Sequence, residues 1–185
     1  MKLRDIIEPI TKLLDDAHAA ETHLEQNDSQ FARRAYVRSV FSSLEGIIWL
    51  LKQVCLTLQS ASSSRIDPAE FALLQDQSYD LKNNGETSVQ TKFLRTSDNL
   101  RFTFRVVNRL FGGHIDLGVG AEPWDAFLGA LAIRHRITHP KKVDELTIAD
   151  QELQVCRNVS SWFNEIILAA IKSILAASEQ AHPCV

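Results

Sequence analysis

The feature that most constrains the fold of this chain is the recurrence of apolar residues every three or four positions over long segments. The clearest case runs from about Gln30 to Gln59, where ten apolar residues keep this spacing: Phe31, Ala35, Val37, Val40, Phe41, Leu44, Ile47, Ile48, Leu51 and Val54. Such spacing places side chains along one face of an α-helix, because successive helical residues are rotated by about 100°. The segment therefore predicts a long amphipathic helix, with Asp28 or Ser29 as its N-cap.

Apolar spacing, together with capping residues and glycine or proline at helix ends, predicts five further helices. They cover about Leu3–Gln26, Pro68–Gln77, Ser97–Phe111, Pro123–Thr138 and Thr147–Ala177. Asp67-Pro68-Ala69-Glu70 predicts the start of the short helix, since it combines an N-cap, a first-turn proline and a glutamate at the third helical position. Thr147 and Asp150 resemble the two ends of a capping box. Pro140 disfavours helical geometry at His139, so the helix before it is expected to end there.

A polar segment, Tyr79–Thr91, interrupts the helical pattern. It contains Asn83-Asn84-Gly85, a turn signal that predicts a small β-hairpin. With four longer helices, two shorter ones and no convincing series of strands, the chain is expected to be all-α, a helical bundle. Because 185 residues, 45% of them hydrophobic, are enough to bury one core, we expect a single domain over residues 1–185 with its core at about 30–177.

The composition narrows the classes of function. A net charge of −3 is unlike that of the strongly basic proteins that wrap nucleic acid, so any nucleic-acid site is expected to be local. Cys55, Cys156 and Cys184 lack C-x-x-C spacing, which indicates neither a zinc site nor a disulfide framework. The sequence also lacks phosphate-binding glycine motifs and metal-protease or serine-hydrolase motifs, so no cofactor and no metal are expected. No secretory signal and no uninterrupted apolar run of membrane-spanning length are present, which predicts a cytoplasmic protein.

The principal candidate functional residues lie at the end of the fifth predicted helix. The segment Leu131–Lys142 contains no acid and carries six basic residues: Arg134, His135, Arg136, His139, Lys141 and Lys142. His135 and His139 share a helical face, and a helix C-terminus favours cations. Arg134 and His139 are about 140° apart on an ideal helix, but Pro140 allows the imidazole of His139 to turn towards Arg134. A helix end that balances its own dipole with solvated cations explains these residues equally well.

Arg134 to His139 has the form R-x-x-x-x-H, with a polar residue after the arginine and a proline after the histidine. This resembles the signature of the HEPN family. The motif also lies on the helix before the last one, as the family's layout requires. The resemblance extends over most of residues 31–175 and includes three further segments: Arg33–Arg38, Ser43–Gly46 and Asp98–Phe102.

Many HEPN domains are metal-independent endoribonucleases that act as dimers, with the motifs of two copies meeting in a cleft. Others bind RNA or assemble with partners without cleaving. The resemblance implies that Arg134 and His139 are the catalytic pair and that His135 is an accessory polar residue. These residue types suit the chemistry, since histidine exchanges protons near neutral pH and a guanidinium stabilises charge on a phosphate. The implied partners are RNA, a second copy of the chain, and a cognate antitoxin or nucleotidyltransferase, as in toxin–antitoxin or defence systems.

Other charged residues are candidates for RNA contacts. Arg101 and Arg105 stand four apart with Arg109 on the fourth predicted helix, in a segment that carries five basic residues against Asp98 alone. Lys141 follows the motif directly. For the arginines, pairing with acids on neighbouring helices or covering apolar surface is the alternative.

Two charged residues of the second helix are further candidates. Arg38 and Glu45 are seven apart and therefore lie on nearly one face, among apolar neighbours. Charges in such positions are costly unless they are paired or functional. Either residue is expected to border the cleft beside Arg134 or to take part in a structural ion pair.

Three functions compete at this point. An RNA-cleaving or RNA-binding dimer is favoured by the intact motif. A non-catalytic helical interaction or assembly module of the same fold is favoured by the acidic total charge. A bundle that binds a nucleotide or another small ligand requires a closed apolar pocket beside Arg134.

Overall fold

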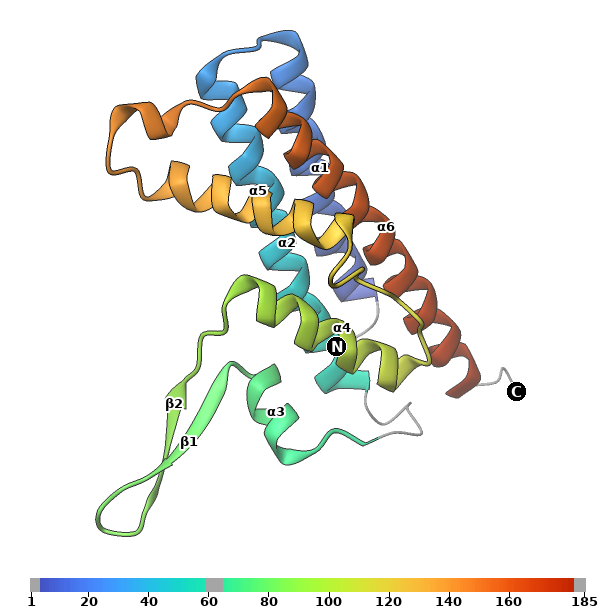
Figure 1. The fold of residues 1–185 in the computed structure, drawn as a ribbon. Helices are drawn as coiled ribbons and strands as arrows, with labels where there is room; N and C mark the ends of the chain where they lie inside the picture. Colours follow the sequence, from blue (N-terminus) through green and yellow to red (C-terminus); the bar gives the residue numbers. More distant parts are fainter. Residues whose placement is uncertain (1–3, 59–64, 182–185) are drawn as a thin grey trace. The chain divides into compact units, whose positions relative to one another are not determined.

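The computed structural model of the chain describes residues 4–58 and 65–181. These residues form helices, apart from one small hairpin and the connections (Figure 1). In chain order the elements are α1 (Arg4–Gln26), α2 (Gln30–Leu58), α3 (Pro68–Leu74), β1 (Gln77–Leu81), β2 (Thr87–Thr91), α4 (Thr96–Phe111), α5 (Glu122–Thr138), the 3₁₀ helix η2 (Val143–Leu146) and α6 (Asp150–Ala181). The helical class and the hairpin are as predicted from the sequence.

The internal contacts divide the chain into two compact units, and each is described by itself. The α5 unit consists of Lys2–Ile47 and Asp116–Leu168. The hairpin unit consists mainly of Ile48–Ile115 and Ala169–Val185. Both α2 and α6 therefore contribute residues to both units. The single-domain organisation stays a prediction.

An aromatic cluster centred on Phe127 forms part of the core of the α5 unit. Phe127 of α5 is fully buried, and its ring centroid lies 6.4 Å from that of Phe41 on α2 and 5.2 Å from that of Trp124. Trp162 of α6 lies 5.8 Å away on the same measure. Because these rings come from three helices, their packing fixes α5 against α2 and α6.

The close approach of α1 to α2 depends on a glycine. A Cβ atom added at Gly46 would lie 2.8 Å from Cδ1 of Leu13. In addition, the hydroxyl of Ser43 on α2 donates a hydrogen bond of 2.5 Å to the carbonyl of Leu13. The absence of a side chain at position 46 thus lets α1 pack directly on α2.

In the hairpin unit, the short helix α3 begins with the predicted capping box. The carboxylate of Asp67 accepts from the backbone of Ala69 and Glu70, and the Glu70 side chain accepts from the backbone of Asp67. After α3 the chain enters β1 through Asp76, whose φ of 54° is left-handed. The carboxylate of Asp76 accepts a 2.6 Å hydrogen bond from the fully buried ammonium group of Lys52, so the entry into the hairpin is tied to α2.

The hairpin has the predicted turn. Its strands are antiparallel, and Tyr79 pairs with Val89. The backbone of Lys82 donates to Glu86, and Gly85 takes a φ of 82°. Asn83, Asn84 and Gly85 therefore form a three-residue loop with glycine at its left-handed position, a common hairpin connection.

Three predicted helix boundaries are wrong by two residues or more. α3 ends at Leu74 rather than Gln77, which lies in β1, and α6 ends at Ala181 rather than about Ala177. The last helix was expected to open with a capping box at Thr147, but α6 begins at Asp150. Thr147 instead follows η2, and its N–H donates to the carbonyl of Asp144. Only half of a capping box is present, two residues later: the Glu152 carboxylate accepts from the backbone of Ala149 at 3.0 Å, and alanine has no side chain that could accept in return.

By length and composition alone, α2 and α6 are long and apolar enough to cross a membrane. In the most apolar stretch of α2, 61% of the residues are buried inside the protein, against 33% for α6. A buried apolar helix is also what the core of a globular protein requires, so this is weak evidence for a membrane span.

Candidate functional site at the end of α5

The helix α5 presents its basic residues at the surface because its apolar residues face the core. Phe127, Ala130, Ile133 and Ile137 are buried at helical spacing. His135 lies between these positions and is exposed. The sequence pattern of α5 thus directs one face into the α5 unit and leaves the Arg134–His139 segment accessible.

The helix ends where Pro140 predicts. The last helical residue is Thr138, and His139 leaves helical geometry with φ −126° and ψ 58°. Its N–H still donates to the carbonyl of His135 at 3.0 Å, so the chain departs directly from the last turn. The side chains of His135 and His139 are both exposed. Two imidazoles are therefore available to solvent at this helix end.

Arg134 is paired with Glu45 of α2. The guanidinium Nη2 lies 3.1 Å from Oε1 and 3.3 Å from Oε2 of the carboxylate. The side chain of Arg134 is 24% exposed and that of Glu45 is 40% exposed, so the pair is partly open to solvent. No other described residue accepts a hydrogen bond from this guanidinium. Because a guanidinium has five N–H donors, Arg134 retains donors for a further anionic group.

Arg38 also contacts α5, but at a different residue. Its Nη2 donates a 2.9 Å hydrogen bond to the carbonyl of Ile137, one of the helix-end carbonyls that have no partner within a helix. Arg38 and Glu45, which share a face of α2 as expected, therefore hold the last turn of α5 at two points. Glu45 binds the side chain of Arg134, and Arg38 binds the backbone.

Further arginines fix the connection between α5 and α6. The guanidinium of Arg33 donates to the carbonyl of Ile148 at 2.9 Å, and that of Arg34 donates to the carbonyl of Leu146 at 3.0 Å. Arg136 of α5 donates to the carbonyl of Thr147 at 2.9 Å. The connection that follows the motif is thus held from both sides by charged donors, which form strong hydrogen bonds.

Two of these arginines also carry ion pairs. Arg33 lies 2.6 Å from Asp28 and 2.7 Å from Asp150, and this guanidinium lowers the pKa of Asp28 below its usual range through its hydrogen bond. Arg136 lies 2.7 Å from the carboxylate of Glu152 at the start of α6. In the sequence, Arg33 stands out only as part of the HEPN resemblance, and Arg136 only as one of the basic residues near the motif. Their structural role depends on which carbonyls the fold brings near them, and that has no signal in the sequence.

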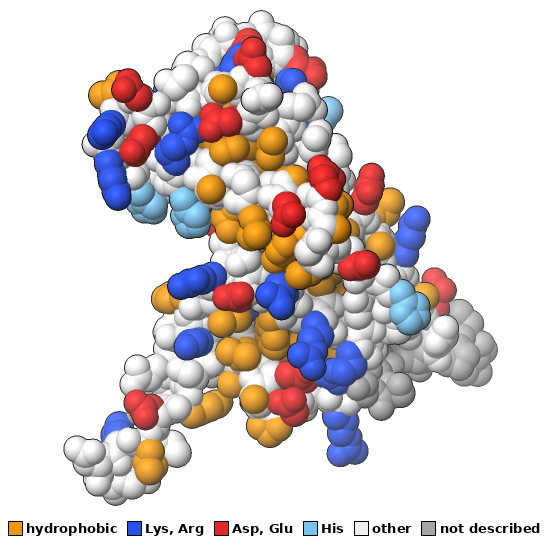
Figure 2. Space-filling model, in the orientation of Figure 1, with side chains coloured by type: hydrophobic (Ala, Val, Ile, Leu, Met, Phe, Trp, Pro, Cys, Tyr) orange, Lys and Arg blue, Asp and Glu red, His pale blue; other side chains and the backbone are white. Residues whose placement is uncertain are grey.

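Exposed basic side chains continue past the motif. Lys141 and Lys142 are exposed, and the backbone N–H of Lys141 donates to the carboxylate of Glu145 at 2.7 Å. Figure 2 shows histidine, lysine and arginine side chains on this part of the surface, around the end of α5 and η2, with acidic side chains between them. Lys141 is therefore accessible on the same segment as the two histidines.

Arg101 and Arg105 belong to the other unit. Both lie exposed on α4 of the hairpin unit, and neither forms an ion pair with another described residue. Arg109, one turn further along α4, pairs instead with Glu70 of α3 and donates to the carbonyl of Arg65 at 2.9 Å. For Arg109 the structural alternative is thus confirmed. Arg101 and Arg105 stay predictions for RNA binding.

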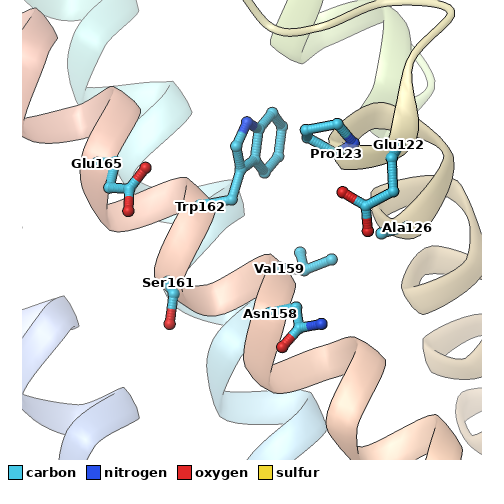
Figure 3. A pocket seen from close by; sticks show the side chains of 8 residues that line it. All are labelled: Glu122, Pro123, Ala126, Asn158, Val159, Ser161, Trp162 and Glu165. Atoms are coloured by element: carbon cyan, nitrogen blue, oxygen red, sulfur yellow. The ribbon is translucent and has the colours of Figure 1, made fainter.

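A pocket of about 330 Å³ lies elsewhere in the α5 unit, between the start of α5 and the middle of α6 (Figure 3). It is lined by Glu122, Pro123, Ala126, Asn158, Val159, Ser161, Trp162 and Glu165. Arg134 is absent from this lining, and the pocket is open and lined by polar and apolar side chains in similar measure. It therefore differs from the closed apolar pocket beside Arg134 that a small-ligand bundle requires.

Within residues 4–58 and 65–181, no three His, Cys, Asp or Glu side chains are grouped so that they would hold a metal ion. What the end of α5 offers is two accessible imidazoles, which transfer protons, and an oriented guanidinium, which binds anions. Chemically, such a set can bind an anionic group such as a phosphate.

Comparison with known proteins gives no family for the chain. No protein-family profile matches it, and neither a curated protein nor a solved structure matches it significantly.

Proposed function

We propose that the end of α5 is the active site of a metal-independent endoribonuclease of the HEPN type, which works as a homodimer. The observation that carries the proposal is the pairing of Arg134 with Glu45 beside the exposed His135 and His139. The arginine is held by Glu45 but partly exposed, whereas both histidines are exposed and neither imidazole bonds to another described residue. An arginine that served only to neutralise a helix dipole would not need a carboxylate to orient it.

The proposed reaction is transesterification within RNA. The ribose 2′-oxygen attacks the adjacent phosphorus and loses its proton to one imidazole, while the bond from phosphorus to the 5′-oxygen breaks and that oxygen takes up a proton. The products are a 2′,3′-cyclic phosphate and a 5′-hydroxyl, and no metal or cofactor takes part. Arg134 binds the phosphate and the negative charge that accumulates on it, and His139 is the principal proton-transfer group, with His135 beside it.

We propose a homodimer because one copy of the chain supplies few catalytic side chains. One copy supplies a single Arg134, and two symmetric copies meeting at their α5 ends supply two guanidiniums and two sets of imidazoles. One histidine then acts as base while another acts as acid. The exposure of both histidines in a single copy is compatible with such a composite site.

Cleavage of end-labelled single-stranded RNA tests the proposal. Wild type is expected to cut in the presence of EDTA and to leave a 2′,3′-cyclic phosphate. His139→Ala is expected to reduce the rate by about 10²–10⁴, the usual contribution of a proton-transfer group. Arg134→Lys keeps the charge but loses the planar, two-pronged contact with phosphate, so it is expected to be severely impaired as well.

Matched controls come from the same unit. His18 is an exposed histidine of α1, and Arg136 makes structural contacts with Glu152 and Thr147. His18→Ala and Arg136→Lys are expected to cut at rates close to that of wild type, with circular dichroism verifying the fold of every variant. Equal cleavage by wild type and His139→Ala would exclude the proposed role of His139. Loss of activity in EDTA that magnesium restores would exclude the metal-independent mechanism.

A non-catalytic assembly module of the same fold is the second candidate. The observation that favours it is the net charge of −3, because an acidic protein repels a polyanion such as RNA overall. In that case the surface at the end of α5 binds a cognate antitoxin, a nucleotidyltransferase or uncut RNA in the cytoplasm. Wild type that binds RNA or such a partner, but cuts none of the RNAs offered, would favour this candidate.

A further inference from the structure

The hairpin unit carries a surface that combines exposed apolar groups with exposed cations. We call it the α4–hairpin surface and define it by eight residues: Tyr79, Leu81, Val89, Lys92, Phe93, Arg95, Arg101 and Arg105. All are exposed and lie on β1, on β2, on α4 or in the short connection between β2 and α4. Figure 1 shows the hairpin extending beyond α3 and α4 within this unit.

The apolar part is concentrated on one face of the hairpin. Tyr79 is 58% exposed and pairs directly with Val89, which is 57% exposed. Leu81 lies two residues after Tyr79 and therefore projects to the same face. Phe93 follows β2 by two residues and is 85% exposed, the highest value among the large hydrophobic side chains of the described residues. Single exposed apolar residues are common, but a group of this kind on a small hairpin indicates a contact surface.

The cationic part begins directly beside Phe93. From Lys92 to Arg105 the chain carries four basic residues against Asp98 alone, a formal charge of +3 in a protein whose net charge is −3. Arg101 and Arg105 are one helical turn apart and both exposed, so they present two guanidiniums on one face of α4. This local excess of positive charge is complementary to a polyanion.

We infer that the α4–hairpin surface binds single-stranded RNA, with phosphates on Arg101 and Arg105 and with unpaired bases stacked on Phe93 and Tyr79. The inference rests on the proposed ribonuclease function and adds a substrate-holding surface in the other unit. Exposed cations alone would bind any polyanion, and exposed aromatic rings alone would bind the surfaces of many proteins. Their combination is the arrangement with which proteins bind single strands, because every unpaired base has a face that stacks on an aromatic ring.

Fluorescence anisotropy with a labelled 2′-O-methyl RNA of about 20 nucleotides tests the inference, since a methylated 2′-oxygen cannot attack the phosphate. Phe93→Ala is expected to weaken binding at least about fivefold, the lower end of what the loss of one stacked base costs. Arg101→Gln and Arg105→Gln are expected to weaken binding too, and each is expected to reduce the slope of log Kd against log salt by about 0.7. Asp98→Asn removes the one acid of the segment and is expected to tighten binding.

Matched controls come from the α5 unit. Phe31 is 68% exposed and Lys12 has a side chain that is 75% exposed, and neither belongs to the α4–hairpin surface. Phe31→Ala and Lys12→Gln are expected to leave Kd within about twofold of the wild-type value. A duplex of the same sequence, whose bases are not free to stack, is expected to lose no affinity in Phe93→Ala.

The two proposals fail separately. If Phe93→Ala and Arg101→Gln bind the methylated RNA as tightly as wild type, the α4–hairpin surface is not the RNA surface, whatever the cleavage assay shows. If these variants lose binding while wild type cuts no RNA, the surface is established and the ribonuclease is excluded. Arginine variants that weaken binding, together with an unaffected Phe93→Ala, would overturn the stacking part of the inference.

Discussion

Glu45 is the residue that positions Arg134 in the candidate site, because its carboxylate lies 3.1 Å from the Arg134 guanidinium. The motif residues were evident from the sequence, since the R-x-x-x-x-H spacing and Pro140 are local features. The partner of Arg134 was not, because it lies 89 residues away. Sequence periodicity placed Arg38 and Glu45 on one face of α2, but which of them meets the Arg134 side chain depends on how α5 packs against α2.

Glu45→Gln is expected to lower kcat/KM for RNA by about tenfold or more while leaving the fold intact. The amide retains an acceptor but loses the charge that orients the guanidinium, and small displacements of a positioning group are costly. If Glu45 acts through Arg134, Glu45→Asp is expected to recover part of the rate, and Glu45→Gln is expected to add little to the defect of Arg134→Lys. A fully additive double variant would show that the two side chains act independently.

The buried thiols and a buried phenol predict how stability depends on alkaline pH. Burial raises the pKa of Cys55 and of Cys156 from 9.0 to about 12, and it raises that of Tyr36 from 10.0 to about 12. Unfolded thiols therefore lose their protons near pH 9, while folded ones keep theirs to about pH 12. Folding stability is expected to be fully present below pH 9 and to fall as the pH rises towards 12.

Urea unfolding between pH 8 and pH 10 measures this effect, because the tyrosine contributes little below its ordinary pKa of 10.0. The loss of stability with rising pH over this range is expected to be smaller in a Cys55→Ala, Cys156→Ala variant than in wild type. The comparison uses the slope of the unfolding free energy against pH. A loss of stability that the smaller side chains cause equally at every pH therefore does not affect it. Identical slopes would mean that the two thiols ionise alike in the folded and unfolded chains.

At the scale of helices and strands, elements with strong local signals were predicted and connections were not. The predicted start of α3 was correct because the side chains of Asp67 and Glu70 each accept a hydrogen bond from the other residue's backbone N–H within one turn. The hairpin was correct because Gly85 supplies the left-handed residue that the loop needs. The start of α6 was wrong because Thr147 is held by Arg136 and by η2, and these contacts come from tertiary structure.

Two identical substitutions in different elements are expected to have opposite effects. Gly85→Ala places a Cβ at a φ of 82°, so it is expected to destabilise the hairpin by about 1 kcal/mol. Gly129 lies inside α5, and an added Cβ there would meet only Cγ1 of Val155, at 4.0 Å. Gly129→Ala is thus expected to stabilise the protein by about 0.5–1 kcal/mol.

Hydrogen exchange separates these two effects. Gly85→Ala is expected to speed exchange at the amides of Lys82 and Gly85, which donate the loop's hydrogen bonds, with little change in α5. Gly129→Ala is expected to slow exchange in α5 and to raise the urea midpoint. A stabilising Gly85→Ala would mean that the loop adopts another turn in solution.

For the whole molecule, the expected assembly is a dimer at tens of micromolar concentration, because the proposed active site needs two copies of the α5 end. Light scattering coupled to gel filtration measures the mass directly against the 20.8 kDa of one chain. His135→Glu introduces like charges where the two copies are proposed to meet, and it is expected to shift the mass towards the monomer. A wild-type protein that stays monomeric throughout would argue strongly against the composite site.

The arginine bonds to the connection after α5 have a consequence for synthesis of the chain. Arg38 reaches a carbonyl 99 residues later, and Arg34 and Arg33 reach carbonyls 112 and 115 residues later. During translation, α2 therefore leaves the ribosome long before the residues that it positions have been made. The end of α5 acquires its final geometry only when residue 148 is free to fold back, so an incomplete nascent chain carries Arg134 without an assembled site. Under the proposed ribonuclease function, the active site would therefore stay incomplete until residue 148 has left the ribosome.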